Sequence, residues 1–225
     1  KVALVYDWLG SLNAHVRGFF KPLIEAGAEV RPYNPPAWTA GIGLFSRTHR
    51  KSQIINAHTA FVSGLCIAAA WNGKPAKGIE AWRDTGLALQ GPIVQDVLAA
   101  FEDTLISQGG TMPPLKRYEN EDAMPAGSTR ARVLATTPAN INTMRLDLNI
   151  IGLATQNLWI TDAYFMPTRM YVQALINAAK AGVDVRILVP RTSDIKWIGT
   201  VSRTQYRSLL DAGVRVFEWD GTMIH

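Results

Sequence analysis

The sequence predicts an α/β protein, mainly because one short pattern occurs three times. Residues 23–30, 178–185 and 209–216 each pass from the end of an amphipathic helix through Ala-Gly into a β-branched strand. The glycine supplies the left-handed conformation that stops a helix, and a strand follows at once. Helix, glycine stop and strand form the second half of a βαβ unit, so three copies favour a largely parallel sheet flanked by helices.

The second half of the chain alternates strands and helices in the order that this pattern requires. Pro167 suits the first turn of a helix, and Pro190 closes an apolar strand. The expected elements are a strand over 158–161, a helix over 167–181, a strand over 183–189, a helix over 200–212, a strand over 214–219 and the start of another strand at 223–225.

The first half repeats this order, starting one unit later. A strand over 2–6, a helix over 16–26 and a strand over 29–33 precede a loop that contains glycine and proline. From the glycine stop to the next histidine the chain runs 22 residues here (27 to 49) and 12 in the second half (213 to 225). We therefore expect two copies of one lobe, each truncated, that differ in the length of the loop at 39–45.

The boundary between the copies is expected in residues 109–130, which are rich in glycine, proline, serine and charge. The predicted organisation is a first lobe over 1–110 without its N-terminal part, a linker over 111–130, and a second lobe over 131–225 without its C-terminal part. Just before the linker, an apolar helical stripe predicts core packing; its members are Val94, Val97, Leu98, Phe101 and Leu105.

Composition restricts the class of protein. With 225 residues, of which 48% are hydrophobic and 18% charged, the chain can bury a sizeable core and is not disordered. The net charge of +5 permits an anionic partner such as phospholipid or nucleic acid.

The single cysteine, Cys66, excludes an intrachain disulfide and is expected to be a small buried residue. No apolar run approaches the roughly 18 residues of a membrane span, and the apolar start without Met predicts an upstream segment.

One stretch carries the chemistry. It reads His49-Arg50-Lys51 and, after four further residues, Asn56. A histidine and a lysine two apart on a strand point to the same face, which then offers a nucleophile or acid together with a fixed positive charge. Phosphodiester chemistry needs both groups. The chain ends at His225, where a second such motif would begin.

This stretch, continued by residues 57 and 60–64, resembles the first HKD motif of the phospholipase D superfamily, and its cardiolipin synthase branch in particular. A lone His-x-Lys would be weak support, but further matches follow in the order of the family and cover nearly the whole chain. They are residues 82–86 with 90–92, residues 163–167, residues 182–190 and residues 206–218.

The resemblance implies two similar phospholipase D-like lobes, each a mixed, largely parallel sheet flanked by helices, with the active site at the lobe interface. One histidine attacks phosphorus and forms a phosphohistidine, while the other protonates the leaving alkoxide and then deprotonates the acceptor alcohol. Which histidine is the nucleophile stays open. Lysines stabilise the charge on the non-bridging oxygens, so neither a metal nor a cofactor is expected.

Carried over residue by residue, the resemblance assigns catalysis to His49, Lys51, His225 and the motif position held by Asn56. The family has Asp at that last position. The Asp accepts a hydrogen bond from the imidazole or supports its charge indirectly, and Asn keeps the shape but removes the charge. If His49 depends on that support, activity is expected to fall.

Three further residues are expected to bind substrate. Ser63 replaces the first glycine of a usual pair, and Gly64 retains the second. Tyr164 lies in a stretch that the family places near the site.

The implied function is a phosphatidyltransferase that forms cardiolipin from phosphatidylglycerol. Its partners would be an anionic phospholipid substrate and a membrane surface, with no nucleic acid. The implied location is the bacterial inner membrane, peripheral or anchored by a segment outside this chain.

Two alternatives stay open. One is a phospholipase D or phosphodiesterase that uses water as acceptor, because the same motif chemistry serves both acceptors. The other is a catalytically impaired lipid-binding homologue, motivated by Asn56 and by the missing Lys and Asp after His225. A nuclease is disfavoured, because small nucleases of the superfamily carry one motif per chain.

Overall fold

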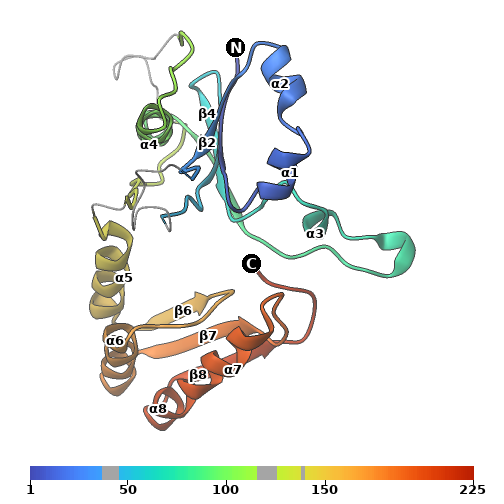
Figure 1. The fold of residues 1–225 in the computed structure, drawn as a ribbon. Coiled ribbons are helices and arrows are strands. Elements are labelled where there is room, and N and C mark those ends of the chain that lie inside the picture. Colours follow the sequence, from blue (N-terminus) through green and yellow to red (C-terminus); the bar gives the residue numbers. More distant parts are fainter. Residues whose placement is uncertain (37–45, 116–125, 138–139) are drawn as a thin grey trace. The chain divides into compact units, whose positions relative to one another are not determined.

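The computed structural model describes residues 1–36, 46–115, 126–137 and 140–225 (Figure 1). The chain divides into two compact units, and we describe each by itself. The first comprises residues 1–63 and 86–138, and the second comprises residues 64–85 and 139–225. Residues 64–85, which we expected in the first lobe, thus group with the second unit. The predicted lobe limits and the interface between lobes stay predictions.

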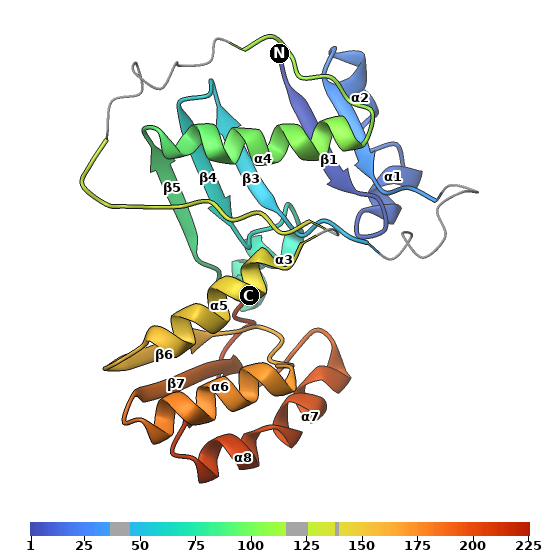
Figure 2. The same cartoon turned by 90° about the vertical axis from the view of Figure 1, so that its left-hand side faces the viewer.

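The first unit combines a parallel strand pair with an antiparallel sheet. Its elements in chain order are β1 (Ala3–Asp7), α1 (Leu12–Val16), α2 (Lys21–Glu25), β2 (Glu29–Tyr33), β3 (Lys51–Ile55), β4 (Thr59–Ser63), β5 (Gly86–Gln90) and α4 (Ile93–Ser107). β1 and β2 pair in parallel, as the sequence predicts, whereas β3, β4 and β5 are antiparallel. α4 lies across β3, β4 and β5 (Figure 2) and buries Val94, Val97 and Leu98 of the expected stripe.

A tight turn explains why β3 and β4 run antiparallel. The N–H of His58 donates to the carbonyl oxygen of Ile55 at 3.0 Å. The two residues between them, Asn56 and Ala57, are both left-handed, with φ of 54° and 56°. Hairpin turns with two left-handed residues match the twist of the strands, and Asn enters this conformation more readily than most residues.

The second unit is built around a parallel sheet. Its elements are α3 (Ala69–Asn72), a 3₁₀ turn (Pro75–Lys77), α5 (Asn142–Leu153), β6 (Asn157–Thr161), α6 (Arg169–Lys180), β7 (Asp184–Pro190), α7 (Lys196–Thr204), α8 (Tyr206–Asp211) and β8 (Arg215–Trp219). The strand order is β6-β7-β8 (Figure 1). Alternate residues of β7, namely Val185, Ile187 and Val189, are buried in one core with residues of α5, α6 and α8. The α/β class predicted from the sequence is confirmed.

The three glycine stops that predicted this class are confirmed in detail. Gly27, Gly182 and Gly213 have φ of 84°, 92° and 92°. In each copy the residue after the glycine donates its N–H to the carbonyl oxygen five residues earlier; the pairs are 28 to 23 at 3.0 Å, 183 to 178 at 3.1 Å and 214 to 209 at 3.0 Å. This pattern is the Schellman motif, which satisfies the last carbonyl groups of the helix and turns the chain into the strand.

Two predicted helices are shortened or interrupted. The helix expected over 16–26 is helical only in its second part, as α2; α1 ends at Val16, and the chain between the two helices includes Gly18 with a φ of 69°. The helix expected over 200–212 begins earlier, as α7, and is interrupted at Gln205, whose N–H donates to the carbonyl oxygen of Ser202 in a 3₁₀-type bond. None of the helices in the described residues is long and apolar enough to cross a bilayer.

Asn56→Val tests the hairpin turn. We expect this substitution to lower the free energy of unfolding by about 1–2 kcal/mol, because a β-branched side chain is strained in the left-handed region. Asn56→Gly, which enters that region freely, should change it by less than about 1 kcal/mol. Urea denaturation of both variants is the measurement, with Asn157→Val at the start of β6 as the control. Equal stability of the Val and Gly variants would contradict the turn geometry.

Candidate active site

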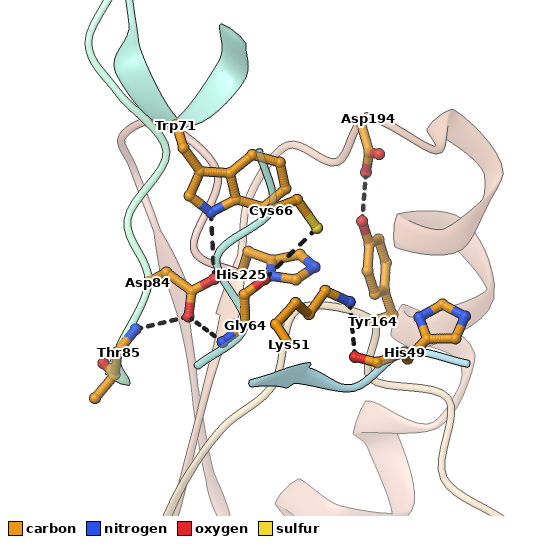
Figure 3. Close-up of polar contacts among 10 residues, drawn as sticks. All are labelled: His49, Lys51, Gly64, Cys66, Trp71, Asp84, Thr85, Tyr164, Asp194 and His225. Atoms are coloured by element: carbon orange, nitrogen blue, oxygen red, sulfur yellow. Dashed lines mark hydrogen bonds and ion pairs between the residues drawn. The ribbon is translucent and has the colours of Figure 1, made fainter. Parts of the chain in front are cut away.

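The first motif lies at the beginning of β3. The strand begins at Lys51, so His49 precedes it in an exposed segment, and the expectation that both residues lie on the strand is wrong. The Nζ of Lys51 turns back and donates to the carbonyl oxygen of His49 at 2.9 Å (Figure 3). The lysine charge is therefore placed beside the backbone of His49 by a direct hydrogen bond.

Contacts on both sides of His49 hold this segment to the first unit. The carboxylate of Asp7, at the end of β1, accepts the N–H of Thr48 at 3.0 Å and lies 3.7 Å from Nη1 of Arg47. On the other side, the guanidinium of Arg50 donates to three oxygens on α4 and on the chain after it; these are Ala100 O at 3.0 Å, Thr104 Oγ1 at 2.8 Å and Thr136 O at 2.6 Å. The residues around His49 are thus fixed by side chains that sequence reasoning did not single out.

Ser63 lies next to Lys51. It is the last residue of β4, and the register pairs it with Lys51 on one side and with Gly86 of β5 on the other. Residues directly opposite each other in an antiparallel pair project to the same face. The structure therefore brings together two residues that the sequence predicts for the site.

Asn56 does not join this group. It occupies the turn after β3, five residues beyond Lys51, which corresponds to about 16 Å along an extended strand. Within the described part of the chain, no hydrogen bond links Asn56 to His49. The contact with the imidazole expected at this motif position is not observed, and a catalytic role for Asn56 stays a prediction.

In the second unit, His225 is paired with a carboxylate. Its Nδ1 lies 2.9 Å from Oδ2 of Asp84, and the side chains are 20% and 7% exposed (Figure 3). The backbones of the two segments are also joined, since Arg83 N–H donates to Met223 O at 2.9 Å and His225 N–H donates to Arg83 O at 2.8 Å. The strand expected at 223–225 is reduced to one parallel bridge between Arg83 and Ile224.

Four donors converge on the Asp84 carboxylate. Oδ1 accepts the N–H of Gly64 at 3.2 Å and of Thr85 at 2.7 Å, while Oδ2 accepts Nε1–H of Trp71 at 3.3 Å and faces Nδ1 of His225. Burial alone would raise the pKa of Asp84, but the hydrogen bonds from His225, Trp71 and Thr85 outweigh it and hold the pKa below its ordinary value. An ionised carboxylate requires Nδ1 to donate, which leaves Nε2 as the imidazole nitrogen available for chemistry.

Gly64 makes room for this carboxylate. A Cβ at position 64 would lie 2.6 Å and 2.8 Å from the two carboxylate oxygens of Asp84. Gly64 was expected to bind substrate, and the structure gives its backbone N–H and its lack of a side chain a role in placing Asp84. Cys66, two residues on, is half-buried, and its Sγ lies 3.8 Å from the carbonyl oxygen of Gly64.

Aromatic rings surround the His225 imidazole. The ring centroids of Trp71, Trp82 and Tyr164 lie 5.2 Å, 6.4 Å and 6.1 Å from it; Trp82 is nearly parallel to the imidazole, and the other two are edge-on. The hydroxyl of Tyr164 donates to Asp194 at 2.9 Å (Figure 3). Burial and this hydrogen bond raise the pKa of Tyr164 to about 12, so the hydroxyl stays protonated.

Sequence reasoning singled out Tyr164 and missed three of these partners. Asp84 and Trp82 were part of a matching stretch but received no role, and Trp71 was not singled out. No spacing rule connects position 84 with position 225, so only the fold reveals the pair. Across the described residues, no cluster of His, Cys, Asp and Glu has an arrangement that could hold a metal ion.

Because the pKa of Asp84 is lowered in the folded state, the free energy of unfolding depends on pH in the acidic range. The ionised Asp84 carboxylate stabilises the folded protein above the ordinary carboxyl pKa, about 4. This stabilisation is lost as the pH falls through the lower pKa that Asp84 has in the folded state. We expect Asp84→Asn to lose less stability than the unaltered chain on acidification from about pH 5 to about pH 3. Urea denaturation at several pH values is the measurement, with exposed Asp211→Asn as the control. Parallel pH curves for the Asp84→Asn and unaltered proteins would contradict the assignment.

Known proteins are similar to this chain. Residues 148–225 match the family described as "Cardiolipin synthase, PLD-like domain". Over its whole length the chain is 32% identical to "Cardiolipin synthase 2" of Bacillus anthracis, covering 44% of that protein, and 32% identical to "Cardiolipin synthase" of Alkalihalophilus pseudofirmus, covering 45%. It is 30% identical to "Cardiolipin synthase A" of Pseudomonas fluorescens, covering 46%.

The chain spans slightly less than half the length of these relatives. The similarity extends over both units and includes the segments that carry His49, Asp84 and His225. The chain is therefore similar over its whole length to cardiolipin synthases, and its residues 148–225 match their phospholipase D-like domain.

Proposed function

We propose that this chain is part of a phosphatidyltransferase that forms cardiolipin from two molecules of phosphatidylglycerol and releases glycerol. The observation that carries the proposal is the pair formed by His225 and the ionised Asp84, in a chain whose relatives are named cardiolipin synthases. A histidine held in this way can give and take a proton at Nε2 during both halves of a transfer reaction.

His225 acts as the general acid and base. With Nδ1 bound to Asp84, the protonated ring delivers the Nε2 proton to the glycerol oxygen as its bond to phosphorus breaks. In the second half, Nε2 takes a proton from the hydroxyl of the acceptor phosphatidylglycerol. The carboxylate stabilises the imidazolium that exists before the first transfer and after the second.

His49 acts as the nucleophile. Among the described residues of the first unit, no carboxylate contacts its ring, whereas His225 is paired with Asp84 and takes the acid–base role, so the nucleophilic role falls to His49. The lone pair attacks phosphorus and a phosphohistidine forms as the glycerol alkoxide leaves. The acceptor oxygen then attacks the same phosphorus, the P–N bond breaks, and His49 is regenerated. Lys51 neutralises charge on the non-bridging oxygens.

The substrate class determines the partner. We propose an anionic phospholipid presented at a membrane surface, with the protein located at the bacterial inner membrane, either peripherally or through a segment outside this chain. The net charge of +5 favours association with such a surface. The proposed reaction uses histidine, lysine and carboxylate groups and assigns no step to a metal or cofactor.

Product analysis tests the proposal. Full-length protein incubated with phosphatidylglycerol vesicles should release one glycerol for each cardiolipin formed. His225→Ala and His49→Ala should each reduce the rate by about 10²–10⁴-fold, because each removes a group that transfers a proton or forms the intermediate. His58→Ala, in the turn after β3, is the control and should retain full activity. Glycerol with phosphatidic acid but no cardiolipin would assign water as acceptor, and no product at all would reject the proposal.

Gly64→Ala tests the placement of Asp84 without changing any charge. The added methyl group overlaps the carboxylate oxygens, so we expect kcat to fall by about 10²-fold while KM changes little. Gly152→Ala on α5, where a Cβ meets no atom within 4 Å, is the matched control. An unchanged kcat in Gly64→Ala would show that the position of Asp84 does not matter to the reaction.

A further inference from the structure

We propose that Trp71 is a positioning residue for His225, acting through the carboxylate of Asp84. The inference deepens the proposed function and rests on it, because it concerns the histidine that transfers protons there. Trp71 donates Nε1–H to Oδ2 of Asp84 at 3.3 Å, and the same oxygen faces Nδ1 of His225 at 2.9 Å (Figure 3). One carboxylate oxygen thus joins the indole and the imidazole.

The two donors on Oδ2 define the direction in which the carboxylate points. A carboxylate oxygen that accepts only one hydrogen bond can turn about its side-chain torsion, whereas two donors from different segments restrict it. The backbone N–H groups of Gly64 and Thr85 fix the other oxygen in the same way. Besides His225, three groups donate to Asp84, and among these only Trp71 donates through its side chain. Trp71 can therefore be substituted without changing a backbone donor.

The Trp71 ring also limits the movement of the imidazole. It stands at 81° to the His225 ring with the centroids 5.2 Å apart, while Trp82 lies nearly parallel to the imidazole at 24° and 6.4 Å. The ring centroids of the two indoles lie 4.9 Å apart. A rotation of the imidazole about its side-chain torsion would therefore meet an aromatic ring, and the hydrogen bond to Asp84 keeps the orientation that exposes Nε2.

The loop that carries the two tryptophans closes on itself. Trp82 N–H donates to Ala70 O at 2.9 Å, and Lys74 pairs with Ile79 through hydrogen bonds of 2.7 Å and 3.2 Å. Gly73 has a φ of 63°, and a Cβ there would lie 2.6 Å from the backbone nitrogen of Ala81. The close approach of the two sides of the loop requires this glycine, and it brings Trp71 and Trp82 to the same imidazole.

Trp71→Phe tests the contribution of the N–H group independently of the aromatic ring. It keeps an aromatic side chain and removes the donor to Asp84, which we expect to reduce kcat about tenfold, as for the loss of one hydrogen bond to a charged group. KM should change less than about twofold, because Trp71 contacts no substrate in this proposal. Since the bond from Trp71 helps to lower the pKa of Asp84, the acid limb of the pH–rate profile should move to higher pH.

Trp71→Leu removes both the donor and the ring. Its kcat should fall further than that of Trp71→Phe, because the imidazole loses its edge-on neighbour. Trp197→Phe is the matched control, since Trp197 lies in the same unit, on α7, and its side chain is 59% exposed. This variant should match the unaltered enzyme in kcat, KM and pH profile.

A second measurement needs no turnover. The ring proton on Nδ1 of His225, hydrogen-bonded to Asp84, should give a downfield proton NMR resonance in the full-length protein, and Trp71→Phe should broaden or shift it while Trp197→Phe should not. An unchanged resonance together with an unchanged kcat in Trp71→Phe would overturn the inference. If the unaltered protein makes no cardiolipin, the proposed function fails, but the comparison of resonances still decides the role of Trp71.

Discussion

The hydrogen bond between Asp84 and His225 is the interaction on which the candidate site depends. It connects two segments that lie 141 residues apart in the chain. A nearly buried carboxylate is unfavourable unless its oxygens are satisfied, and here two backbone groups, one indole and the imidazole supply the donors. The features around it follow from this requirement: a glycine at position 64, a loop that returns Trp71, and backbone pairing between Arg83 and the end of the chain.

The parallel sheet of the second unit explains where the other site residues come from. Tyr164 follows the end of β6, Asp194 follows β7 and His225 follows β8. In a parallel sheet the carboxyl ends of neighbouring strands open at one edge, so three segments that are distant in sequence emerge together from a rigid core. Two of the glycine stops, Gly182 and Gly213, serve the opposite edge of this sheet, where each returns the chain from a helix into the next strand. Local sequence thus builds the framework, and the segments at the other edge carry the chemistry.

The same division between local framework and long-range contacts decides which features could be predicted from the sequence. The glycine stops, the strands after them and the apolar stripe of α4 depend on neighbouring residues, so pattern reasoning found them. The antiparallel pairing of β3 and β4 was missed because its turn is Asn-Ala rather than a strong signal such as Asn-Gly. His49, Lys51 and His225 were predicted as site residues through a motif, and their catalytic role stays a prediction. Asp84 and Trp71 were given no role because their contacts with His225 and with each other are long-range.

The motif also led to an expectation about charge at position 56. The sequence assigned the support of an imidazole to that position, whereas the structure places Asn56 in a turn about 16 Å from Lys51 along the strand. The carboxylate of Asp84, in direct contact with its imidazole and largely shielded from water, acts over 2.9 Å. In the described residues the imidazole of His225 has its carboxylate partner in Asp84, and the effect of Asn in place of Asp at position 56 stays a prediction.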